Sequence, residues 1–268
     1  MEYREYSIIY KSRKDQFTIY PIGDIHAGTV HCAESEIKKL VKAIGEDPLA
    51  LWIGMGDYGD LITPHDPRWD IEVISPWVER SNVAESQRVW LRNLLKPIAP
   101  KCIGLLGGNH EDSIRRYNAQ DIHLDLCRDL SVPYLGYSCF IRFLFKRVRA
   151  EGEVHSFVGV FQHGSGAAQT EGGKIMRLKK LMDSFDADIY AMGHLHDIVT
   201  DSLAQLYPDQ SGKIKQKIRV GAITGSWMRT YSQGLRPNYA EMRGYYPTMI
   251  GCPRFLVSPD KRILKVMV

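Results

Sequence analysis

The stretch LALWIGMGDYGD, residues 49–60, decides the fold. Its first half is a short apolar run with a β-branched residue and an aromatic, which predicts a strand buried on both faces. The run ends in Gly56-Asp57, and in open α/β sheets the chemistry gathers just past the carboxyl ends of such strands. An Asp in that place more often only caps a turn. The meaning of Asp57 therefore depends on how the other strands end.

Four further strand-like segments end in the same kinds of residue. Each runs into glycine and into Asp, Asn or His, side chains that bind metal ions. The segments are 17–26, ending in Gly23-Asp24-Ile25-His26; 101–111, ending in Gly108-Asn109-His110-Glu111; 156–164, ending in His163-Gly164; and 187–196, ending in Gly193-His194-Leu195-His196. Five strand ends therefore offer potential metal ligands.

The size and chemistry of this donor set limit the kind of metal site. Seven donors are too many for one tetrahedral ion and suit two ions that share a ligand. Oxygen and imidazole donors without thiolates favour Mn, Fe, Zn, Co or Ni over a structural zinc site. A carboxylate between two cations offers an oxygen to each, and Asp57 is the predicted bridge. The donors are Asp24, His26, Asp57, Asn109, His163, His194 and His196.

The spacing of the paired donors predicts how they converge. In an extended segment alternate residues point the same way, so both members of an Asp-x-His or His-x-His pair are expected to face one cluster. This applies to residues 24 and 26 and to residues 194 and 196.

With these motifs in order, the sequence resembles the calcineurin-like metallophosphoesterase superfamily. The family pattern D-x-H, G-D-x-x-D, G-N-H-[DE], H and G-H-x-H is matched at residues 24–26, 56–60, 108–111, 163 and 193–196. The resemblance implies an α/β fold, a two-sheet β-sandwich flanked by helices in four layers. It also implies one metal held by Asp24, His26, Asp57 and His196, and a second held by Asp57, Asn109, His163 and His194.

The resemblance further implies an enzyme, a metal-dependent phosphoesterase. Two divalent ions, with Mn²⁺ the first choice, would acidify a shared water, whose pKa in bulk is about 15.7, so that a hydroxide attacks phosphorus in line. His110 is the predicted catalytic residue and would protonate the leaving oxygen. Asp60 is expected to orient a ligand histidine or its loop, and Glu111 or Asp112 to orient His110.

Composition sets wider limits. The chain has 268 residues, 44% of them hydrophobic and 25% charged, as in an ordinary globular protein. We expect a single domain over residues 1–268. The opening MEYREYSIIYKSRKDQ is too charged for a signal peptide, and no apolar run reaches membrane length, so we expect a cytoplasmic protein without a membrane partner. The five cysteines lack a C-x-x-C pattern, so we expect them to be reduced thiols.

The remaining pattern predicts the other elements. Apolar residues at helical spacing indicate helices over 33–45, 83–95 and 174–185, of which the first two are crossovers between parallel strands. A further helix is expected within 113–130, with Arg115, Arg116 and Tyr117 in the loop that enters it. Hairpins are predicted for 137–149 with 153–162, joined at 150–152, and for 198–207 with 213–224. A closing hairpin is predicted near the end, from 255–257 and 263–268.

Three regions are candidates for binding substrate. The long loop 61–82 is expected beside the metals, where Arg68, Trp69, Trp77 and Arg80 could contact substrate, although an ordered surface loop whose tryptophans cover the edge of the sandwich is the alternative. Arg115 and Arg116 follow a predicted ligand by six and seven residues and could hold a phosphate oxygen, although simple solvated charge is the alternative. The segment 225–268 is expected to wrap the fold. Its first part, 225–254, mixes four arginines, Arg229 among them, with aromatic residues against a single acid, which also suits a groove for phosphates and bases.

The sequence therefore predicts a phosphodiesterase or nuclease acting on DNA, RNA or nucleotides, and the net charge of +4 permits such a polyanion. The alternative is a phosphomonoesterase or protein phosphatase. The Ser/Thr phosphatases that the resemblance includes carry arginines where this chain reads Leu61-Ile62 and Gly107-Gly108, which disfavours that subgroup. A non-catalytic interaction scaffold of the same fold is a further alternative, although such proteins lose ligands and none of the seven is missing.

Overall fold

The structure, a computed structural model, describes residues 1–148 and 153–268. The strands are β1 (Glu2–Tyr10), β2 (Phe17–Ile22), β3 (Ala50–Gly54), β4 (Cys102–Leu105), β5 (Ser138–Arg147), β6 (Val154–Gln162), β7 (Ile189–Met192), β8 (Ile198–Pro208), β9 (Ile214–Thr224), β10 (Arg254–Ser258) and β11 (Ile263–Met267). The helices are α1 (Glu34–Glu46), α2 (Val83–Leu95), α3 (Asn109–Asn118), α4 (Ile122–Leu130), α5 (Glu171–Ser184) and α6 (Tyr239–Met242), with short 3-10 helices η1 (Ile71–Val73) and η2 (Lys96–Lys101).

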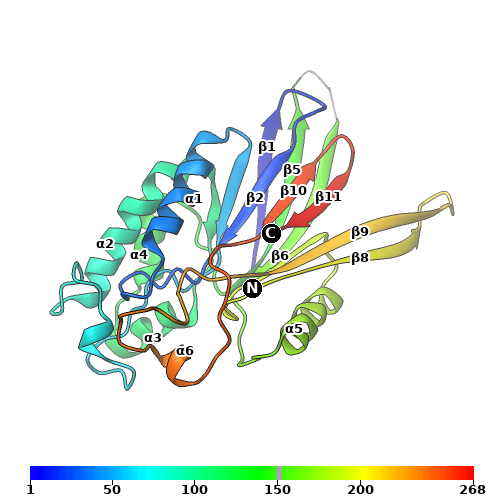
Figure 1. Ribbon diagram of the computed structural model, residues 1–268. Coiled ribbons are helices and arrows are strands. Elements are labelled where there is room, and N and C mark those ends of the chain that lie inside the picture. Colours follow the sequence, from blue (N-terminus) through cyan, green and yellow to red (C-terminus); the bar gives the residue numbers. More distant parts are fainter. Residues whose placement is uncertain (149–152) are drawn as a thin grey trace.

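The strands form two sheets that pack against each other, with helices on both outer faces (Figure 1). The five-stranded sheet has the order β11-β10-β2-β3-β4, and the six-stranded sheet has the order β1-β5-β6-β7-β9-β8. The predicted α/β sandwich flanked by helices is confirmed.

The five-stranded sheet contains the predicted crossovers. β2, β3 and β4 pair in parallel, with α1 returning the chain from β2 to β3 and α2 from β3 to β4. Apolar side chains of these helices, such as Ile37 and Leu91, are fully buried against the outer face of the sheet. Trp52 of β3 lies in the same cluster, and its indole N–H donates to the carbonyl of Ile98 at 2.8 Å.

The six-stranded sheet is mixed. β5 and β6 form the predicted antiparallel hairpin, although its turn at 150–152 lies outside the described residues. β6, β7 and β9 pair in parallel, and α5 covers their outer face through residues such as Leu178 and Met182. β8 and β9 pair along their whole length and extend beyond the rest of the sheet (Figure 1).

Aromatic side chains fill the space between the two sheets. Phe17 of β2 and Phe145 of β5 lie with their ring centroids 5.1 Å apart, and Phe157 of β6 lies 5.8 Å from Phe145. Each buried ring of this size stabilises the fold by roughly 1.5–3 kcal/mol. This core fixes the two sheets relative to each other.

Three predicted helices differ from the structure in their bounds. α5 starts at Glu171, before its predicted start at residue 174. The span 113–130 contains two helices, α3 and α4, because Ala119 adopts a left-handed conformation with φ 54° that ends the first one. α3 starts earlier than predicted, at Asn109, so Arg115 and Arg116 lie on a helix and not in a loop. α1 also continues through Gly45, where its end was predicted, to Glu46.

Across residues 1–148 and 153–268, none of the helices combines the length and the apolar character needed to span a membrane.

Replacing Phe145 tests the core between the sheets. Phe145→Ala removes a fully buried ring and leaves a cavity, so we expect the free energy of unfolding to fall by about 3–5 kcal/mol. Tyr117→Ala is the control, because Tyr117 is 83% exposed and should change stability by less than about 0.5 kcal/mol. Urea denaturation of both variants measures the difference, and equal midpoints would contradict the described packing.

Candidate metal centre

The seven predicted donors follow the carboxyl ends of five strands. β2, β3 and β4 of one sheet and β6 and β7 of the other each end between one and four residues before their first donor. Because these ends meet at the same edge of the sandwich, side chains from both sheets reach a common site.

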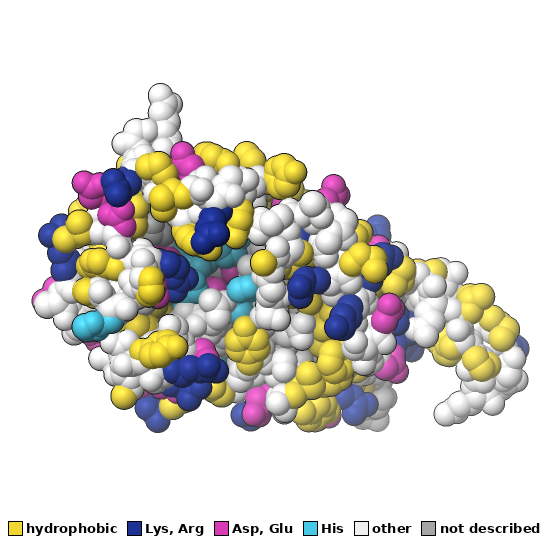
Figure 2. All heavy atoms as spheres, turned by 90° about the horizontal axis from the view of Figure 1, so that it is seen from below, with side chains coloured by type: hydrophobic (Ala, Val, Ile, Leu, Met, Phe, Trp, Pro, Cys, Tyr) yellow, Lys and Arg dark blue, Asp and Glu magenta, His cyan; other side chains and the backbone are white. Residues whose placement is uncertain are grey.

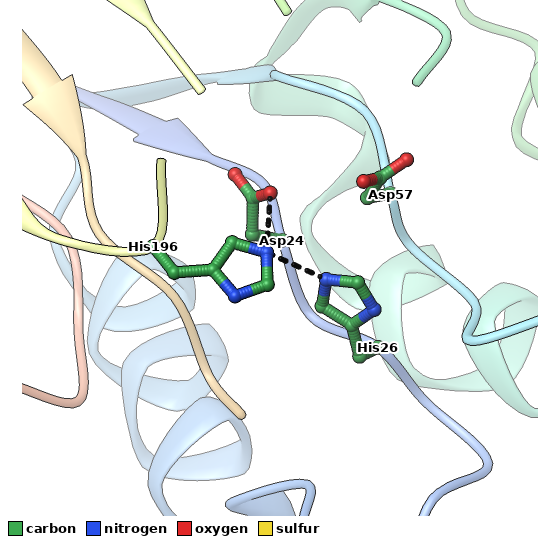
Figure 3. A group of neighbouring side chains, drawn as sticks. All are labelled: Asp24, His26, Asp57 and His196. Atoms are coloured by element: carbon green, nitrogen blue, oxygen red, sulfur yellow. Dashed lines mark hydrogen bonds and ion pairs between the residues drawn. The ribbon is translucent and has the colours of Figure 1, made fainter. Parts of the chain in front are cut away.

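Four donors form the first group. Candidate ligand atoms of Asp24, His26, Asp57 and His196 all lie within 4.8 Å of one another. The Nε2 atom of His196 is 3.2 Å from Oδ1 of Asp24 and 3.0 Å from Nε2 of His26 (Figure 3). These residues are the set that the resemblance implies for one ion.

The remaining donors form a second group that shares Asp57. The Nε2 atom of His163 is 3.2 Å from Oδ2 of Asp57, and ligand atoms of Asp57, His163 and His194 lie within 4.8 Å of one another. The side-chain oxygen of Asn109 is 3.0 Å from Nε2 of His163 and 2.8 Å from Nδ1 of His194. The Asp57 carboxylate therefore belongs to both groups and lies between them, in the position that the sequence predicts for a bridging ligand.

Left-handed backbone conformations bring these donors together. The φ angles are 48° at Asp24, 49° at His26, 51° at Asp57, 70° at His194 and 50° at His196. The prediction that paired donors align as alternate residues of an extended strand is wrong in its geometry, because β2 ends at Ile22 and β7 at Met192. Tight turns after the strands direct the side chains inward. Such conformations cost about 1–3 kcal/mol each and persist only when the surroundings hold them.

Backbone hydrogen bonds between the motifs hold these turns. The N–H of Asp24 donates to the carbonyl of Gly56 at 2.9 Å, and the N–H of His26 donates to the carbonyl of Asp57 at 3.1 Å. The N–H of His194 donates to Oδ2 of Asp24 at 3.0 Å. The three motifs fix one another.

The chemistry of the cluster fits cations. Asp24 and Asp57 are buried, and no Lys or Arg of the described chain forms an ion pair with either. Burial alone would raise the pKa of Asp57, but neighbouring histidines, His163 foremost, hold it well below its usual range. Two imidazole nitrogens also face each other at 3.0 Å, and Nδ1 of His26 is buried without a hydrogen bond. Buried charges require partners, so these His and Asp groups can hold metal ions.

The charge on Asp57 also affects its histidine neighbour. Burial would lower the pKa of His163, but the carboxylate of Asp57 outweighs burial and raises this pKa to about 10. In the absence of metal, a proton on this imidazole therefore offsets the buried carboxylate.

Glu111 supports the site from behind. Its buried carboxylate accepts hydrogen bonds from the backbone N–H groups of Asp57 and Gly108, both at 2.9 Å, and of Tyr58 at 2.8 Å. Burial and then the Asp57 charge raise the pKa of Glu111. Glu111 thus fixes the backbone that carries Asp57. The roles predicted for Glu111 and Asp112 in orienting His110 stay predictions: the Glu111 carboxylate bonds to backbone N–H groups, and the Asp112 carboxylate pairs with arginines on the surface of α3.

His110 lies beside both groups. Its backbone N–H donates to Oδ1 of Asp57 at 3.0 Å, and its Nδ1 donates to the carbonyl of Asp60. Its ring packs edge-on against the ring of His26, with centroids 4.8 Å apart. Burial would lower the pKa of His110, but the carboxylates of Asp57 and Asp60 outweigh it and raise the pKa. The Asp60 carboxylate also lies 3.4 Å from Nδ1 of His26, in a position to orient that ring.

Glycines permit the close approach of the motifs. A Cβ atom on Gly108 would lie 2.1 Å from Oδ1 of Asp57, and one on Gly56, where φ is +92°, would lie 2.7 Å from Nδ1 of His163. Any other residue at either position would displace a donor.

A cavity of about 670 Å³ opens above the donors. Figure 2 shows histidine and acidic side chains on the floor of a hollow that hydrophobic and basic side chains surround. The loop 61–82 contributes Arg68 and Trp69 to one wall, and residues 228–248 contribute Tyr239, Arg243 and Tyr246 to another. The first wall belongs to the loop that the sequence placed beside the metals.

The arginines predicted to bind substrate lie outside this cavity wall. Arg115 and Arg116 both pair with Asp112 at 2.6 Å on α3, and Arg229 donates to the carbonyl of Cys32 at 3.4 Å. Their role in binding substrate stays a prediction. The cavity instead contains Arg68, whose guanidinium donates to both carboxylate oxygens of Asp66, at 3.0 and 2.8 Å. The sequence offers Arg68 and Trp69 of loop 61–82 as substrate contacts, and both line the cavity, whereas Trp77 and Arg80 do not.

Comparisons with known proteins give little similarity. No protein-family model matches the chain, and no curated protein matches it. One similar solved structure is a conserved uncharacterized protein, described as a predicted phosphoesterase, from Streptococcus pneumoniae TIGR4. It is 12% identical, with a TM-score of 0.36 over 94% of this chain and 98% of that chain. A similarity this low supports no inference about function.

Removing the Glu111 carboxylate tests its supporting role. Glu111→Ala leaves three buried N–H groups without an acceptor, so we expect the free energy of unfolding to fall by about 3 kcal/mol or more. Asp112→Ala, on the same helix, removes only surface ion pairs and should cost less than about 1 kcal/mol. Thermal and urea unfolding compare the two variants. Equal losses would show that the Glu111 hydrogen bonds do not fix this region.

Proposed function

We propose that this protein is a binuclear metal-dependent phosphoesterase that hydrolyses phosphodiesters of nucleic acid or nucleotides. The observation that carries the proposal is the position of the buried Asp57 carboxylate, which belongs to both donor groups. Both groups lie at the floor of a cavity with room for a substrate.

The proposed ligand sets are those of the two donor groups. Asp24, His26, Asp57 and His196 would hold one ion, and Asp57, Asn109, His163 and His194 would hold the other. Two divalent cations there would lower the pKa of a water shared between them and neutralise charge on the phosphate oxygens. Mn²⁺ is the ion to test first, because it accepts both oxygen and imidazole ligands.

His110 would act on the leaving group. Its Nδ1 is occupied by the carbonyl of Asp60, which leaves Nε2 as the ring nitrogen that can meet a substrate in the cavity. In the doubly protonated ring, Nε2–H can donate to the departing oxygen, while the bond to Asp60 keeps the ring oriented. The bond from the His110 N–H to Asp57 ties this acid to the metal ligands.

Arg68 would bind the phosphate. Its two hydrogen bonds to Asp66 fix the plane of the guanidinium on the cavity wall, and its remaining N–H groups are available to a phosphate oxygen. Because Asp66 already offsets the charge of Arg68, the pair would provide orientation more than net positive charge.

The charges on the cavity wall favour a diester over a monoester. Lys174 pairs with Asp197 at 2.9 Å, as Arg68 pairs with Asp66, so two basic side chains of the wall are already neutralised. A diester carries one negative charge and a monoester nearly two at neutral pH. Walls on two sides of the donors also offer surface to groups on both sides of the phosphorus. A monoesterase or protein phosphatase is the alternative function, and a non-catalytic scaffold is a less favoured one.

Comparison of two chromogenic substrates tests the proposal. With Mn²⁺ added, we expect hydrolysis of bis(p-nitrophenyl) phosphate with a higher kcat/KM than that of p-nitrophenyl phosphate. A strong preference for the monoester would overturn the diesterase proposal. Absence of turnover on both substrates, together with fewer than two Mn²⁺ per chain, would favour the scaffold.

Substitution of Asp57 tests the shared ligand. Asp57→Asn removes the charge that both groups share, so we expect Mn²⁺ binding to weaken at both sites, measured by isothermal titration calorimetry. Asp112→Asn removes a carboxylate from the surface of α3 and should leave Mn²⁺ binding unchanged. Loss of binding at one site alone would show that Asp57 does not bridge.

Substitution of His110 separates chemistry from metal binding. His110→Ala should lower kcat on bis(p-nitrophenyl) phosphate by about 10²- to 10⁴-fold while Mn²⁺ binding stays intact. His65→Ala is the control, because His65 is exposed and lies outside the cavity wall. A His110 variant that keeps the wild-type rate would exclude the proton-donor role.

A further inference from the structure

One wall of the cavity is rich in tyrosine. Tyr239, Tyr245 and Tyr246, together with Met242 and Arg243, line the cavity from the C-terminal segment, and we call these five residues the tyrosine wall. Tyr239 is 46% exposed, Tyr246 65% and Met242 70%. Large apolar groups left exposed at the mouth of a cavity mark a surface that binds a ligand.

The tyrosine wall is held in place although its side chains are exposed. The side chain of Asn238 accepts from the N–H of Glu241 at 2.9 Å and donates to the carbonyl of Arg229 at 2.8 Å, which fixes α6. The hydroxyl of Tyr231 donates to the carbonyl of Tyr245 at 2.8 Å. The backbone that carries the rings is therefore held in place before a ligand arrives, which reduces the entropy lost on binding.

A salt bridge joins the tyrosine wall segment to the opposite wall. Arg236 pairs with Asp70 and, at 3.1 Å, with Glu72, both in loop 61–82. The carbonyl of Arg236 also accepts from His31 at 3.0 Å. The two walls thus form one connected groove over the donors.

Arg243 is the basic side chain of the cavity without an acidic partner in the described chain. Arg68 and Lys174 are paired with carboxylates, whereas the guanidinium of Arg243 lies 5.0 Å from the ring centroid of Tyr239 and forms no ion pair. Stacking on the tyrosine holds the guanidinium flat and leaves its N–H groups free. Arg243 can therefore bind an anion beside an aromatic surface.

We propose that the tyrosine wall binds an unpaired nucleotide next to the scissile phosphate, with the base stacked on the tyrosine rings and Arg243 on the flanking phosphate. The proposal rests on the phosphodiesterase function above and names its substrate class, single-stranded nucleic acid. Stacking of bases on aromatic rings beside a basic groove is how single strands are bound without sequence preference.

The shape and charge of the cavity favour this class over others. A cavity of about 670 Å³ lies in the range of sites for single small ligands, so it admits one or two unpaired nucleotides and not the width of a duplex. A phosphopeptide would require a cluster of unpaired arginines around a dianionic phosphate, whereas Arg243 alone is unpaired on this wall.

Binding of a fluorescein-labelled eight-residue oligo(dT), measured by anisotropy in EDTA and again with Mn²⁺ in a His110→Ala background, tests the proposal without depending on turnover. Tyr239→Ala and Tyr246→Ala should each weaken binding about 5- to 100-fold, while Tyr239→Phe, which keeps the ring, should retain it. Arg243→Gln should lower the slope of log affinity against log salt by about 0.7. Calorimetry with Mn²⁺ confirms that the donors of each variant remain intact.

Matched controls lie outside the cavity. Tyr117→Ala removes an exposed tyrosine of α3, and Arg254→Gln removes an exposed arginine of β10, and neither should change oligo(dT) binding. Equal effects of control and tyrosine-wall variants would overturn the proposal. So would binding of the duplex, or of a phosphoserine peptide, as tightly as the single strand. A wild type that hydrolyses bis(p-nitrophenyl) phosphate but does not bind oligo(dT) would overturn the nucleotide subsite and leave the phosphodiesterase function standing.

Discussion

The rest of the site depends on three hydrogen bonds that the buried carboxylate of Glu111 accepts from backbone N–H groups. These bonds join the loop after β3, through Asp57 and Tyr58, to Gly108 at the start of α3. Burying a carboxylate is costly, and three hydrogen bonds from the backbone compensate for it. These hydrogen bonds fix the backbone of Asp57, so its carboxylate stays at the junction of the two donor groups. A flexible loop could not hold the carboxylate in that position.

The fold makes this junction possible by ending strands of both sheets at one edge. The aromatic core around Phe145 fixes the two sheets relative to each other, so the turns that follow the strands can carry strained residues. Five of the seven donors adopt left-handed conformations, and the hydrogen bonds between their motifs hold them there. The stability of the sandwich thus compensates for the cost of the left-handed conformations in these turns.

The fold class and the donor set could be predicted from the sequence because both depend on local patterns. Apolar runs that end in Gly and Asp, Asn or His are visible without knowledge of the fold. The partners of Glu111 could not be predicted, because its contacts to Asp57 and Tyr58 join residues far apart in the chain. The same limit applies to the cavity wall. The sequence offers both Arg68, in the long loop, and Arg115, close to a ligand motif, as residues that could bind substrate. It could not separate them: α3 turns Arg115 toward Asp112 and away from the cavity, whose wall contains Arg68.

In the proposed function, the floor of the cavity would carry the chemistry and its walls would choose the substrate. The donors on the floor of the cavity follow strand ends that the core fixes, whereas both walls are irregular segments, tied to each other through Arg236 and Asp70. Loops on a rigid scaffold can change without loss of the fold. Differences in substrate preference should therefore arise in the walls. Under the proposed function, Arg243 of the C-terminal segment would set the position of a second phosphate, because Arg68 is neutralised by Asp66 and Arg243 is not.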